Sequence, residues 1–241
     1  MEDLDRAFED FKKGLGVQLK NYVAIILDKS GSMESIQKEA LQAFNEQIKI
    51  LKKSTGEMET YVSCITFGTE VDEPLIWCGN VKKAKKIKDS DYKPEGLTAL
   101  YDAVGTTITK LKNIKDYDDE NTSFLIIIIT DGFENASKEY NSESISKLIT
   151  ELQETNRWTF TYLGSNQDLA KVKDILKIPE GNMMSFVSTH DGTSWAVNSA
   201  TVSTAYYMSS RTGGNTSVTD YYSNNITNTT SSNKKKLKTR N

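Results

Sequence analysis

Two strand-length apolar runs, each followed by an aspartate, constrain the fold of this chain more than any other feature. The run "NYVAIIL" covers residues 21–27 and precedes Asp28, and "SFLIIIIT" covers residues 123–130 and precedes Asp131. Continuous apolar runs of this length are typical of parallel sheets, in which helices cover both faces. The second run is the most apolar segment of the chain, so we expect it near the centre of the sheet.

The rest of the chain alternates between strand-like and helix-like segments. Strands are predicted at 21–27, 59–67, 74–78, 123–130, 159–164 and 183–188, and helices at 34–53, 98–114, 142–154, 167–177 and 193–209. Only a short polar turn separates 59–67 from 74–78, so these two strands are expected to pair antiparallel. The pattern predicts an α/β fold with a doubly wound, mostly parallel central sheet and one antiparallel edge strand, in a Rossmann-like arrangement.

Both ends of the chain differ from this central region, 20–210, which we expect to form one domain. Residues 1–19 are predicted as an N-terminal amphipathic helix that packs on its own domain, with a partner-binding arm as the alternative. Its apolar face would carry Leu4, Ala7, Phe8, Phe11 and Leu15. From about Gly213 the chain is rich in Ser, Thr, Asn and Lys, so we predict that residues 211–241 form a disordered or partner-dependent tail.

The composition of the 241 residues argues against several classes of protein. A formal net charge of −3 predicts neither a nucleic-acid-binding nor a membrane-surface protein, although the basic terminus "KKKLKTR" leaves a nucleic-acid contact open. The acidic N-terminus is not a secretory signal, and no apolar run is long enough to span a bilayer. The two cysteines favour buried free thiols over a disulfide framework. We therefore expect a soluble, cytoplasmic protein without membrane contacts.

Small oxygen-bearing side chains stand where the predicted strands end. Asp28, Ser30 and Ser32 follow the first strand, Asp131 follows the fourth, and Thr98 leads into a helix. Ligand sites of open α/β sheets lie at the carboxyl ends of strands, so these side chains are expected to converge. Two carboxylates and several hydroxyls, without nitrogen or sulfur ligands, suit a hard cation such as Mg²⁺ better than zinc or copper. Such an ion would keep a coordination position open for an outside ligand.

Other uses of these residues fit the sequence less well. A P-loop ends in Gly-Lys-Ser/Thr and a dinucleotide fingerprint has three spaced glycines, and "DKSGSMES" has neither. A serine hydrolase needs a base, but the chain has a single histidine, His190, and no nucleophile-elbow motif. Ser32 or Ser35 could cap the following helix. Capping alone does not explain acids and hydroxyls that come from three separate loops.

The same residues resemble a known family. "DKSGS" resembles the Asp-x-Ser-x-Ser motif of von Willebrand factor type A (vWA) domains, "GLT" resembles their threonine loop, and "IIIITDG" resembles their second aspartate strand. Together these motifs resemble a complete metal-ion-dependent adhesion site (MIDAS). The resemblance covers roughly residues 20–210. Later segments, such as "TDGFENASKEY" and "WTFTYLGSNQD", resemble cytosolic bacterial and phage members, which implies a bacterial host cell and leaves phage origin open.

The resemblance implies a non-enzymatic, protein-binding module. Asp28, Ser30, Ser32, Thr98 and Asp131 would bind Mg²⁺ (or Mn²⁺), directly or through water, and an Asp or Glu of a partner protein would fill the open position. Glu134 departs locally and could crowd the metal face or order a water there, so it could tune ligand choice. Two alternatives stay open: a structural or assembly component of a phage or bacterial complex with a vestigial metal site, and a metal-dependent phosphohydrolase. The last helix could also shift when ligand binds.

Overall fold

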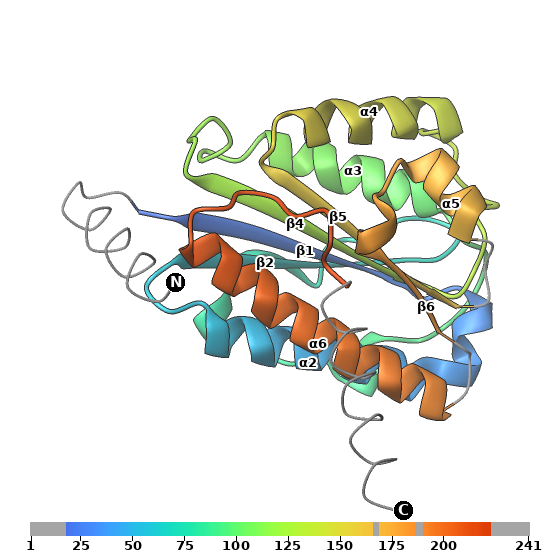
Figure 1. The fold of residues 1–241 in the computed structure, drawn as a ribbon. Helices are drawn as coiled ribbons and strands as arrows, with labels where there is room; N and C mark the ends of the chain where they lie inside the picture. Colours follow the sequence, from blue (N-terminus) through green and yellow to red (C-terminus); the bar gives the residue numbers. More distant parts are fainter. Residues whose placement is uncertain (1–17, 166–168, 187–189, 223–241) are drawn as a thin grey trace, which may run out of the picture.

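The computed structural model describes residues 18–165, 169–186 and 190–222. Its strands form one sheet in the order β3-β2-β1-β4-β5-β6 (Figure 1). The strands are β1 (Lys20–Asp28), β2 (Glu59–Phe67), β3 (Ile76–Asn80), β4 (Thr122–Thr130), β5 (Trp158–Ser165) and β6 (Met183–Phe186). All neighbouring strands pair in parallel except β2 and β3, which are antiparallel. The predicted fold class, including the antiparallel edge strand, is confirmed.

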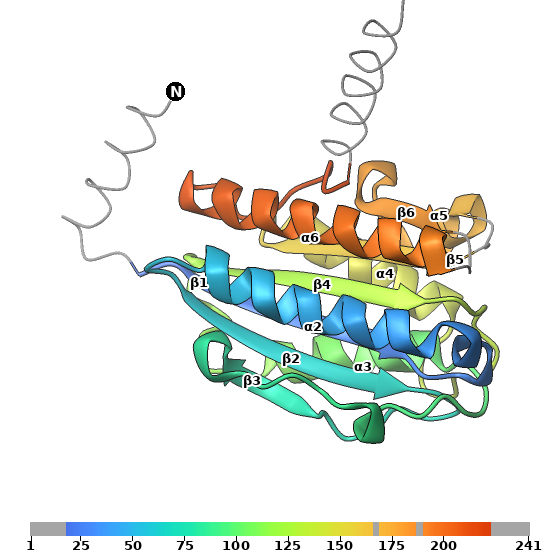
Figure 2. The ribbon, with the colours of Figure 1, turned by 90° about the horizontal axis from the view of Figure 1, so that it is seen from below.

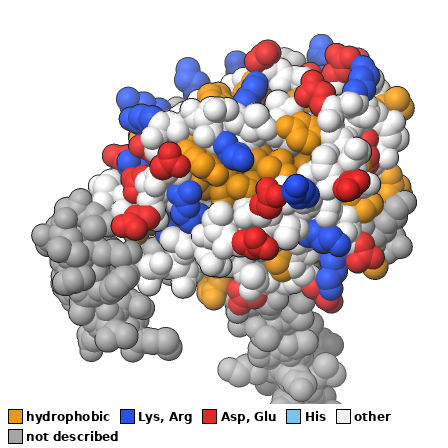
Figure 3. Space-filling model, turned by 90° about the horizontal axis from the view of Figure 1, so that it is seen from above, with side chains coloured by type: hydrophobic (Ala, Val, Ile, Leu, Met, Phe, Trp, Pro, Cys, Tyr) orange, Lys and Arg blue, Asp and Glu red, His pale blue; other side chains and the backbone are white. Residues whose placement is uncertain are grey.

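Helices cover both faces of this sheet. They are α2 (Gln37–Ser54), α3 (Leu100–Lys112), α4 (Ser142–Glu154), α5 (Leu169–Leu176) and α6 (His190–Thr212). Figures 1 and 2 show α2 and α6 side by side on one face, and α3, α4 and α5 on the other. On the face that carries α3 and α4, Figure 3 shows hydrophobic side chains gathered near the middle, with charged side chains of both signs around them.

The hydrophobic core has two layers, one on each side of the sheet. Alternate residues of β1 contribute to opposite layers: Val23, Ile25 and Leu27 pack toward α2 and α6, and Tyr22, Ala24 and Ile26 pack toward α3 and α4. All nine residues of β4 are buried. Because β4 lies between β1 and β5, both of its faces are covered by helices, which explains its unbroken apolar sequence. The central position predicted for this strand is confirmed.

Two predicted boundaries move by a few residues. The helix predicted at 34–53 is a 3₁₀ turn, Gly31–Ile36, followed by α2. The strand predicted at 74–78 is Ile76–Asn80. Pro74 has no backbone N–H to donate, and Leu75 N–H makes a single bond to the Cys64 carbonyl before the regular pairing starts. Neither shift changes the topology.

The prediction that the tail begins at residue 211 is wrong for residues 211–222. Arg211 is 1 % exposed, and Tyr221 and Tyr222 are 1 % and 3 % exposed. The Tyr221 hydroxyl lies 2.6 Å from Thr204 Oγ1 of α6, and Tyr222 N–H donates to the Gly181 carbonyl. The polar composition of the whole C-terminal region conceals these two aromatic side chains, which bury enough surface to hold the segment against the domain.

Some predicted features lie outside the described residues. These are most of the N-terminal amphipathic helix, residues 1–17, and the remainder of the C-terminal tail, residues 223–241. Within the described ranges, no helix is both long and apolar enough to cross a membrane.

Candidate metal centre

The predicted site lies at the point where the strand order reverses. The chain runs outward from β1 to β2 and β3 on one side, and from β4 to β5 and β6 on the other. Asp28 ends β1, and Thr130 ends the adjacent strand β4, immediately before Asp131. The crevice at the carboxyl ends of such a pair is where open α/β sheets bind ligands. The topology therefore brings the two aspartates to one edge of the sheet, although 103 positions separate them in the numbering.

Asp28 forms the buried base of the site. Its side chain is 0 % exposed, and its two carboxylate oxygens each accept one hydrogen bond. Ser30 N–H donates to Oδ1 at 2.6 Å, and the Thr130 hydroxyl donates to Oδ2 at 2.6 Å. The Tyr92 hydroxyl donates to the Asp28 backbone carbonyl at 2.5 Å. These bonds hold the carboxylate in place but bring no positive charge to it.

The two serines link the first loop to the third. Ser30 Oγ lies 3.1 Å from Ser32 Oγ, and the Ser32 hydroxyl donates to Asp131 Oδ1 at 2.5 Å. Ser30 is buried, Asp131 is half-buried and Ser32 is exposed. The site is therefore closed at Asp28 and open to solvent on the side of Ser32 and Asp131.

Gly132 shows where the remaining ligand, Thr98, lies. A Cβ atom added to Gly132 would stand 2.9 Å from Thr98 Oγ1, 3.5 Å from Asp28 Oδ2 and 3.5 Å from Ser30 Oγ. Three side-chain oxygens from the first and second loops thus surround one small space that the glycine of the third loop leaves free. The fold brings all five predicted ligands together. Asp28, Ser30 and Thr98 share this space, Ser32 is joined to Ser30, and Asp131 is joined to Ser32.

Asn135 positions Thr98, and the sequence analysis missed this residue. Thr98 N–H donates to Asn135 Oδ1 at 2.9 Å, and Asn135 N–H donates to the Thr98 carbonyl at 3.0 Å. This reciprocal pair joins the threonine loop to the loop after β4. The only signal in the sequence is an asparagine four residues after Asp131, and an asparagine in a loop is common enough to carry little information.

Glu134 lies at the N-terminus of α3. Its Oε2 accepts the N–H of Tyr101 at 2.9 Å, and its Oε1 accepts the N–H groups of Ala136 and Ser137 at 2.9 and 2.8 Å. The Ser137 hydroxyl donates to Oε2 at 2.7 Å. Because α3 has no side-chain cap of its own at Ala99, Glu134 supplies the missing acceptor from another loop. This geometry gives Glu134 a structural role, and its tuning of the metal face stays a prediction.

Asp102 of α3 in turn accepts hydrogen bonds from the loop after β4, and the sequence analysis did not select this residue. Its carboxylate accepts the N–H groups of Lys138, Glu139 and Tyr140 at 2.7, 3.0 and 2.8 Å. The first turn of α3 and the loop after β4 thus hold each other through Glu134 and Asp102. These hydrogen bonds fix the relative position of Thr98 and Asp131. Thr98 lies just before α3, and Asp131 lies just before the loop segment that carries Glu134.

The electrostatics of the site favour an added positive charge. Burial raises the pKa of Asp28 to about 6, against the hydrogen bonds from Thr130 and Ser30, which lower it. Burial also raises the pKa of Asp131, against the hydrogen bond from Ser32. Neither carboxylate forms an ion pair with a lysine or arginine in the described part of the chain. A cation between them would compensate the cost of burying their charge.

The donor set fits a hard divalent cation. Every convergent side-chain atom is an oxygen, which Mg²⁺ and Mn²⁺ accept and which softer metals disfavour. With only two carboxylates, the site differs from a carboxylate-rich cage, and the described residues contain no cluster of three or more His, Cys, Asp or Glu side chains able to hold a metal. The residues present would therefore balance the charge of a divalent ion with only two carboxylates and leave it free positions toward solvent.

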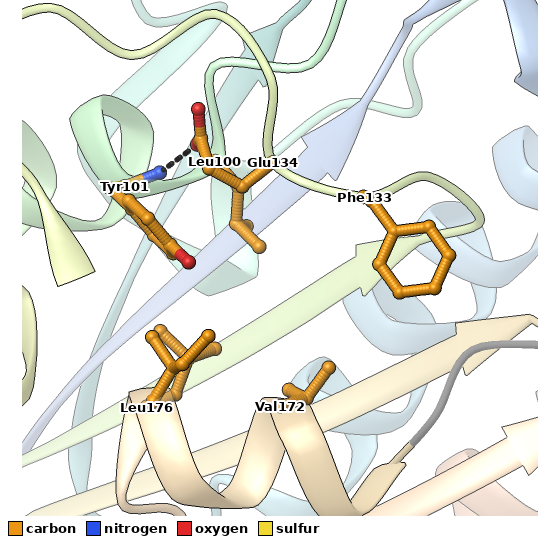
Figure 4. A pocket seen from close by; sticks show the side chains of 7 residues that line it. Leu100, Tyr101, Phe133, Glu134, Val172 and Leu176 are labelled. Atoms are coloured by element: carbon orange, nitrogen blue, oxygen red, sulfur yellow. Dashed lines mark hydrogen bonds between the residues drawn. The ribbon is translucent and has the colours of Figure 1, made fainter.

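Apolar side chains surround the open side of the site. Leu97 and Phe133, which stand directly beside Thr98 and Gly132 in the sequence, are each 50 % exposed. Phe133 also lines a cavity between the start of α3, the loop after β4 and α5 (Figure 4). The volume of this cavity is ≈ 60 Å³. It is lined by Leu100, Tyr101, Phe133, Glu134, Val172, Ile175 and Leu176. Exposed apolar area next to a candidate ligand site is typical of a binding surface.

A family model agrees with this geometry. The von Willebrand factor type A domain model matches residues 23–197, which is most of the chain. The match begins within β1 and ends within α6, so it includes all five candidate ligands. The fold and the site define a doubly wound α/β domain with an oxygen-lined crevice at its switch point. The chain belongs to the von Willebrand factor type A family.

Solved structures with low sequence identity share this fold. Proximal thread matrix protein 1 from the mussel byssus matches with a TM-score of 0.53 and 14% identity, over 78% of this chain and 47% of that one. Another structure of that protein, with a zinc-occupied MIDAS motif, matches with a TM-score of 0.50 and 15% identity, over 79% and 46%. A von Willebrand factor type A protein from Catenulispora acidiphila matches with a TM-score of 0.50 and 14% identity, over 78% and 43%.

These identities are low, so the structural matches establish the fold alone. The chain spans less than half the length of the matched chain in each of these three structures. A search of curated protein sequences found no match.

Proposed function

We propose that this domain is a divalent-metal-dependent protein-binding module. Asp28, Ser30, Ser32, Thr98 and Asp131 hold Mg²⁺ (or Mn²⁺), directly or through water. The ion bridges to an Asp or Glu of a partner protein. The observation that carries this proposal is the shared space at Gly132, where oxygens of Asp28, Ser30 and Thr98 stand within 3.5 Å of one point.

The charge balance supports a partner carboxylate as the outside ligand. Asp28 and Asp131 together offset the two charges of the cation, and the other three ligands are neutral. Because neutral oxygens donate little charge, the ion stays electrophilic and favours an anionic ligand over water. When bound, the metal supplies Lewis-acid character at this edge of the sheet. The protein residues supply its position, and the burial of Asp28 keeps the base of the site dry.

The surroundings of the site support a partner with an apolar residue next to its acid. Leu97 and Phe133 flank the opening, and neither carries charge. The only titratable carboxylate that lines the neighbouring cavity is Glu134, whose oxygens already accept four hydrogen bonds. A partner loop would place its carboxylate on the metal and an apolar side chain against Phe133.

Metal binding is tested first, without any partner. Calorimetric titration of Mn²⁺ and Mg²⁺ into the chelator-treated protein should show one site. Asp131→Ala should weaken it by at least about 100-fold, and Gly132→Ala by about tenfold, because the added methyl group displaces Thr98 Oγ1 without changing any charge. Asp116→Asn, a carboxylate at the opposite end of the sheet, is the matched control. Binding that is equal in Asp131→Ala and the unchanged protein contradicts the site.

Partner binding is tested second, in a pull-down from the source cell. A specific partner should be captured with Mg²⁺, lost with chelator and lost with Asp131→Ala, whereas Asp116→Asn should retain it. Loss of capture must coincide with an unchanged circular-dichroism spectrum. Capture that persists in chelator would show that the contact does not use the metal.

A further inference from the structure

A groove lined by lysines lies beside the edge strand β3, and none of the candidate metal ligands lines it. Its volume is ≈ 710 Å³. We call it the lysine groove, and the residues that define it are Leu75, Ile76, Lys83, Lys85, Lys86 and Lys88. The two apolar residues precede or begin β3, and the four lysines follow the strand in the segment "VKKAKKIK".

The backbone that carries these lysines is held firmly. Ala84 and Ile87, which alternate with the lysines, are 8 % and 7 % exposed and pack into the core layer of α2. Lys52 Nζ of α2 donates to the Ala84 carbonyl at 2.6 Å. Asn45 of α2 accepts the Ile87 N–H at 3.1 Å and donates to the Ile87 carbonyl at 3.2 Å. The buried residues therefore fix the direction in which the exposed lysines project.

The described residues balance only part of the positive charge of the groove, because Asp91 is the one acidic residue among those that line it, beside four lysines. Lys83, Lys85, Lys86 and Lys88 are all exposed, and none forms an ion pair with another described residue. Four like charges in one short segment repel one another, since their spacing is comparable to the Debye length of about 8–10 Å at physiological salt. An acidic occupant would relieve this repulsion.

The groove also has an apolar part, which favours an occupant that carries apolar side chains. Leu75 is 41 % exposed, which makes it one of the few large apolar side chains on the surface of the described chain. Ile76 beside it is half-buried. An occupant that fits both features would carry several carboxylates along one side and apolar residues along another.

The N-terminal sequence of the same chain has this composition. Residues 1–11 read "MEDLDRAFEDF" and contain five acidic residues and a single arginine. Leu4, Ala7, Phe8 and Phe11 recur at helical spacing among the acids. The segment 82–88 contains five lysines and no acid. The two segments are therefore opposite in charge and both carry apolar residues.

The described chain also starts close to the lysine segment. Gln18 Nε2 donates to the Glu57 carbonyl at 3.0 Å. Lys82 Nζ, at the start of the lysine segment, donates to the carbonyl of the neighbouring Gly56 at 3.4 Å. Gln18, at the start of the described chain, and Lys82, at the start of the lysine segment, therefore both contact the turn that contains Gly56 and Glu57. Residues 12–17 alone can span up to about 20 Å when extended, which lets residues 1–11 reach the groove.

We propose that residues 1–11 bind intramolecularly in the lysine groove. Their carboxylates lie opposite Lys83, Lys85, Lys86 and Lys88, and their apolar side chains cover Leu75 and Ile76. The bound segment also shields the outer side of β3, an edge strand that could otherwise pair with another chain. This assignment is independent of the metal centre.

Zero-length carboxyl–amine cross-linking of the full chain tests this assignment. Cross-links should join Glu9 or Asp10 to the groove lysines, and 0.5 M NaCl should reduce them. Lys85→Glu with Lys86→Glu should lower their yield by about tenfold, because two charge pairs become repulsive. Glu9→Lys with Asp10→Lys should lower it equally. The combined fourfold variant should restore cross-links, now between Lys side chains at 9 and 10 and Glu side chains at 85 and 86.

Lys112→Glu with Lys115→Glu, two exposed lysines on the α3 side, is the matched control and should leave the yield unchanged. Circular dichroism verifies that each variant is folded. Equal cross-linking to the groove and to the control lysines, or failure of the fourfold variant to restore it, would overturn the proposal. A mixture of ¹⁴N- and ¹⁵N-labelled protein separates cross-links within one chain from those between copies, and cross-links found only between copies would equally overturn it.

Discussion

The two ends of β1 both carry charged side chains, but the charges are balanced in different ways. At the amino end, Lys20 Nζ donates to Asp116 Oδ1 at 2.9 Å and to Asp119 Oδ2 at 3.1 Å, and the Tyr22 hydroxyl donates to Asp116 Oδ2 at 2.6 Å. At the carboxyl end, Asp28 receives hydrogen bonds only from neutral groups. At the amino end, Lys20 and its two aspartates form ion pairs within the chain. At the carboxyl end, Asp28 has no positively charged partner among the described residues.

The pKa directions express the same contrast. The hydrogen bond from Tyr22, followed by that from Lys20, lowers the pKa of Asp116, and the backbone N–H of Asn121 is the main cause that lowers the pKa of Asp119. Burial instead raises the pKa of Asp28 and Asp131. The comparison teaches that carboxylates at the amino end stabilise the fold, whereas those at the carboxyl end cost stability until a cation binds.

The largest expected effect comes from breaking the balanced end. Arg211 is buried, and its guanidinium donates to Asn21 Oδ1 at 2.8 Å and to the carbonyls of Asn121 and Asn215 at 3.0 and 2.9 Å. Arg211→Met leaves these acceptors unpaired and should lower the free energy of unfolding by about 3 kcal/mol or more. Urea denaturation measures the loss. A change below 1 kcal/mol would show that water replaces the guanidinium.

The same substitution at the two ends should have opposite consequences. Asp116→Asn removes the charged acceptor of Lys20 and should cost about 2 kcal/mol of stability while metal affinity stays unchanged. Asp28→Asn removes a buried charge, so the metal-free protein should change by no more than about 1 kcal/mol, but metal binding should be lost. Urea denaturation of both variants measures the change in stability, and calorimetric titration of both measures the change in metal affinity. Equal destabilisation by both variants would erase the distinction between the two ends.

The pH dependence of stability separates the ends without mutation. In chelator, the folded state binds a proton at Asp28 near pH 6 and the unfolded chain only near its ordinary value of 3.8. This group therefore makes the metal-free fold more stable as the pH falls from 7 toward 4. Asp116 acts in the opposite sense, because its pKa is lowered: its stabilisation is present above 3.8 and is lost as the pH falls further.

The metal-free protein should therefore be most stable between about pH 4 and 6, as measured by urea titration across this range. Asp28→Asn should reduce the slope of the unfolding free energy against pH above pH 4. We attribute the slope that remains to Asp131, whose pKa is also raised. An identical slope in the variant and the unchanged protein would disprove the assigned cause.

The smallest effect on stability is expected at the apolar rim of the open end. Phe133 is 50 % exposed, so Phe133→Ser should change the free energy of unfolding by no more than about 0.5 kcal/mol and leave Mn²⁺ affinity unchanged. Partner affinity should fall by about tenfold, because an apolar contact is removed from the interface. Val202→Ser on α6, at 55 % exposure, is the control and should leave partner affinity unchanged.

Much of the fold was predictable because it depends on local patterns. The apolar runs before Asp28 and Asp131 predicted two buried strands, and the short link between 59–67 and 74–78 predicted the antiparallel pair. The five candidate ligands could be selected because each directly follows a strand or precedes a helix. Hydrophobic periodicity and position along a strand are properties of a short stretch of chain, so they can be seen without the tertiary structure.

The missed residues act through contacts between distant segments. Asn135 and Asp102 hold the loops of the candidate site through backbone N–H groups up to 38 positions away. Tyr221 and Tyr222 are buried although their segment is polar in composition. No local pattern encodes which backbone groups a distant side chain will meet.

By itself, the sequence determined the order of strands and helices, the two core layers and the identity of the oxygen donors. Only the tertiary structure decided that Asp28 lies without a positive partner at one end of β1 while Lys20 forms ion pairs with Asp116 and Asp119 at the other. The physical reason is that pairing and burial of charge depend on three-dimensional proximity. Two aspartates of the same chain, Asp28 and Asp116, therefore have opposite pKa shifts and opposite effects on stability.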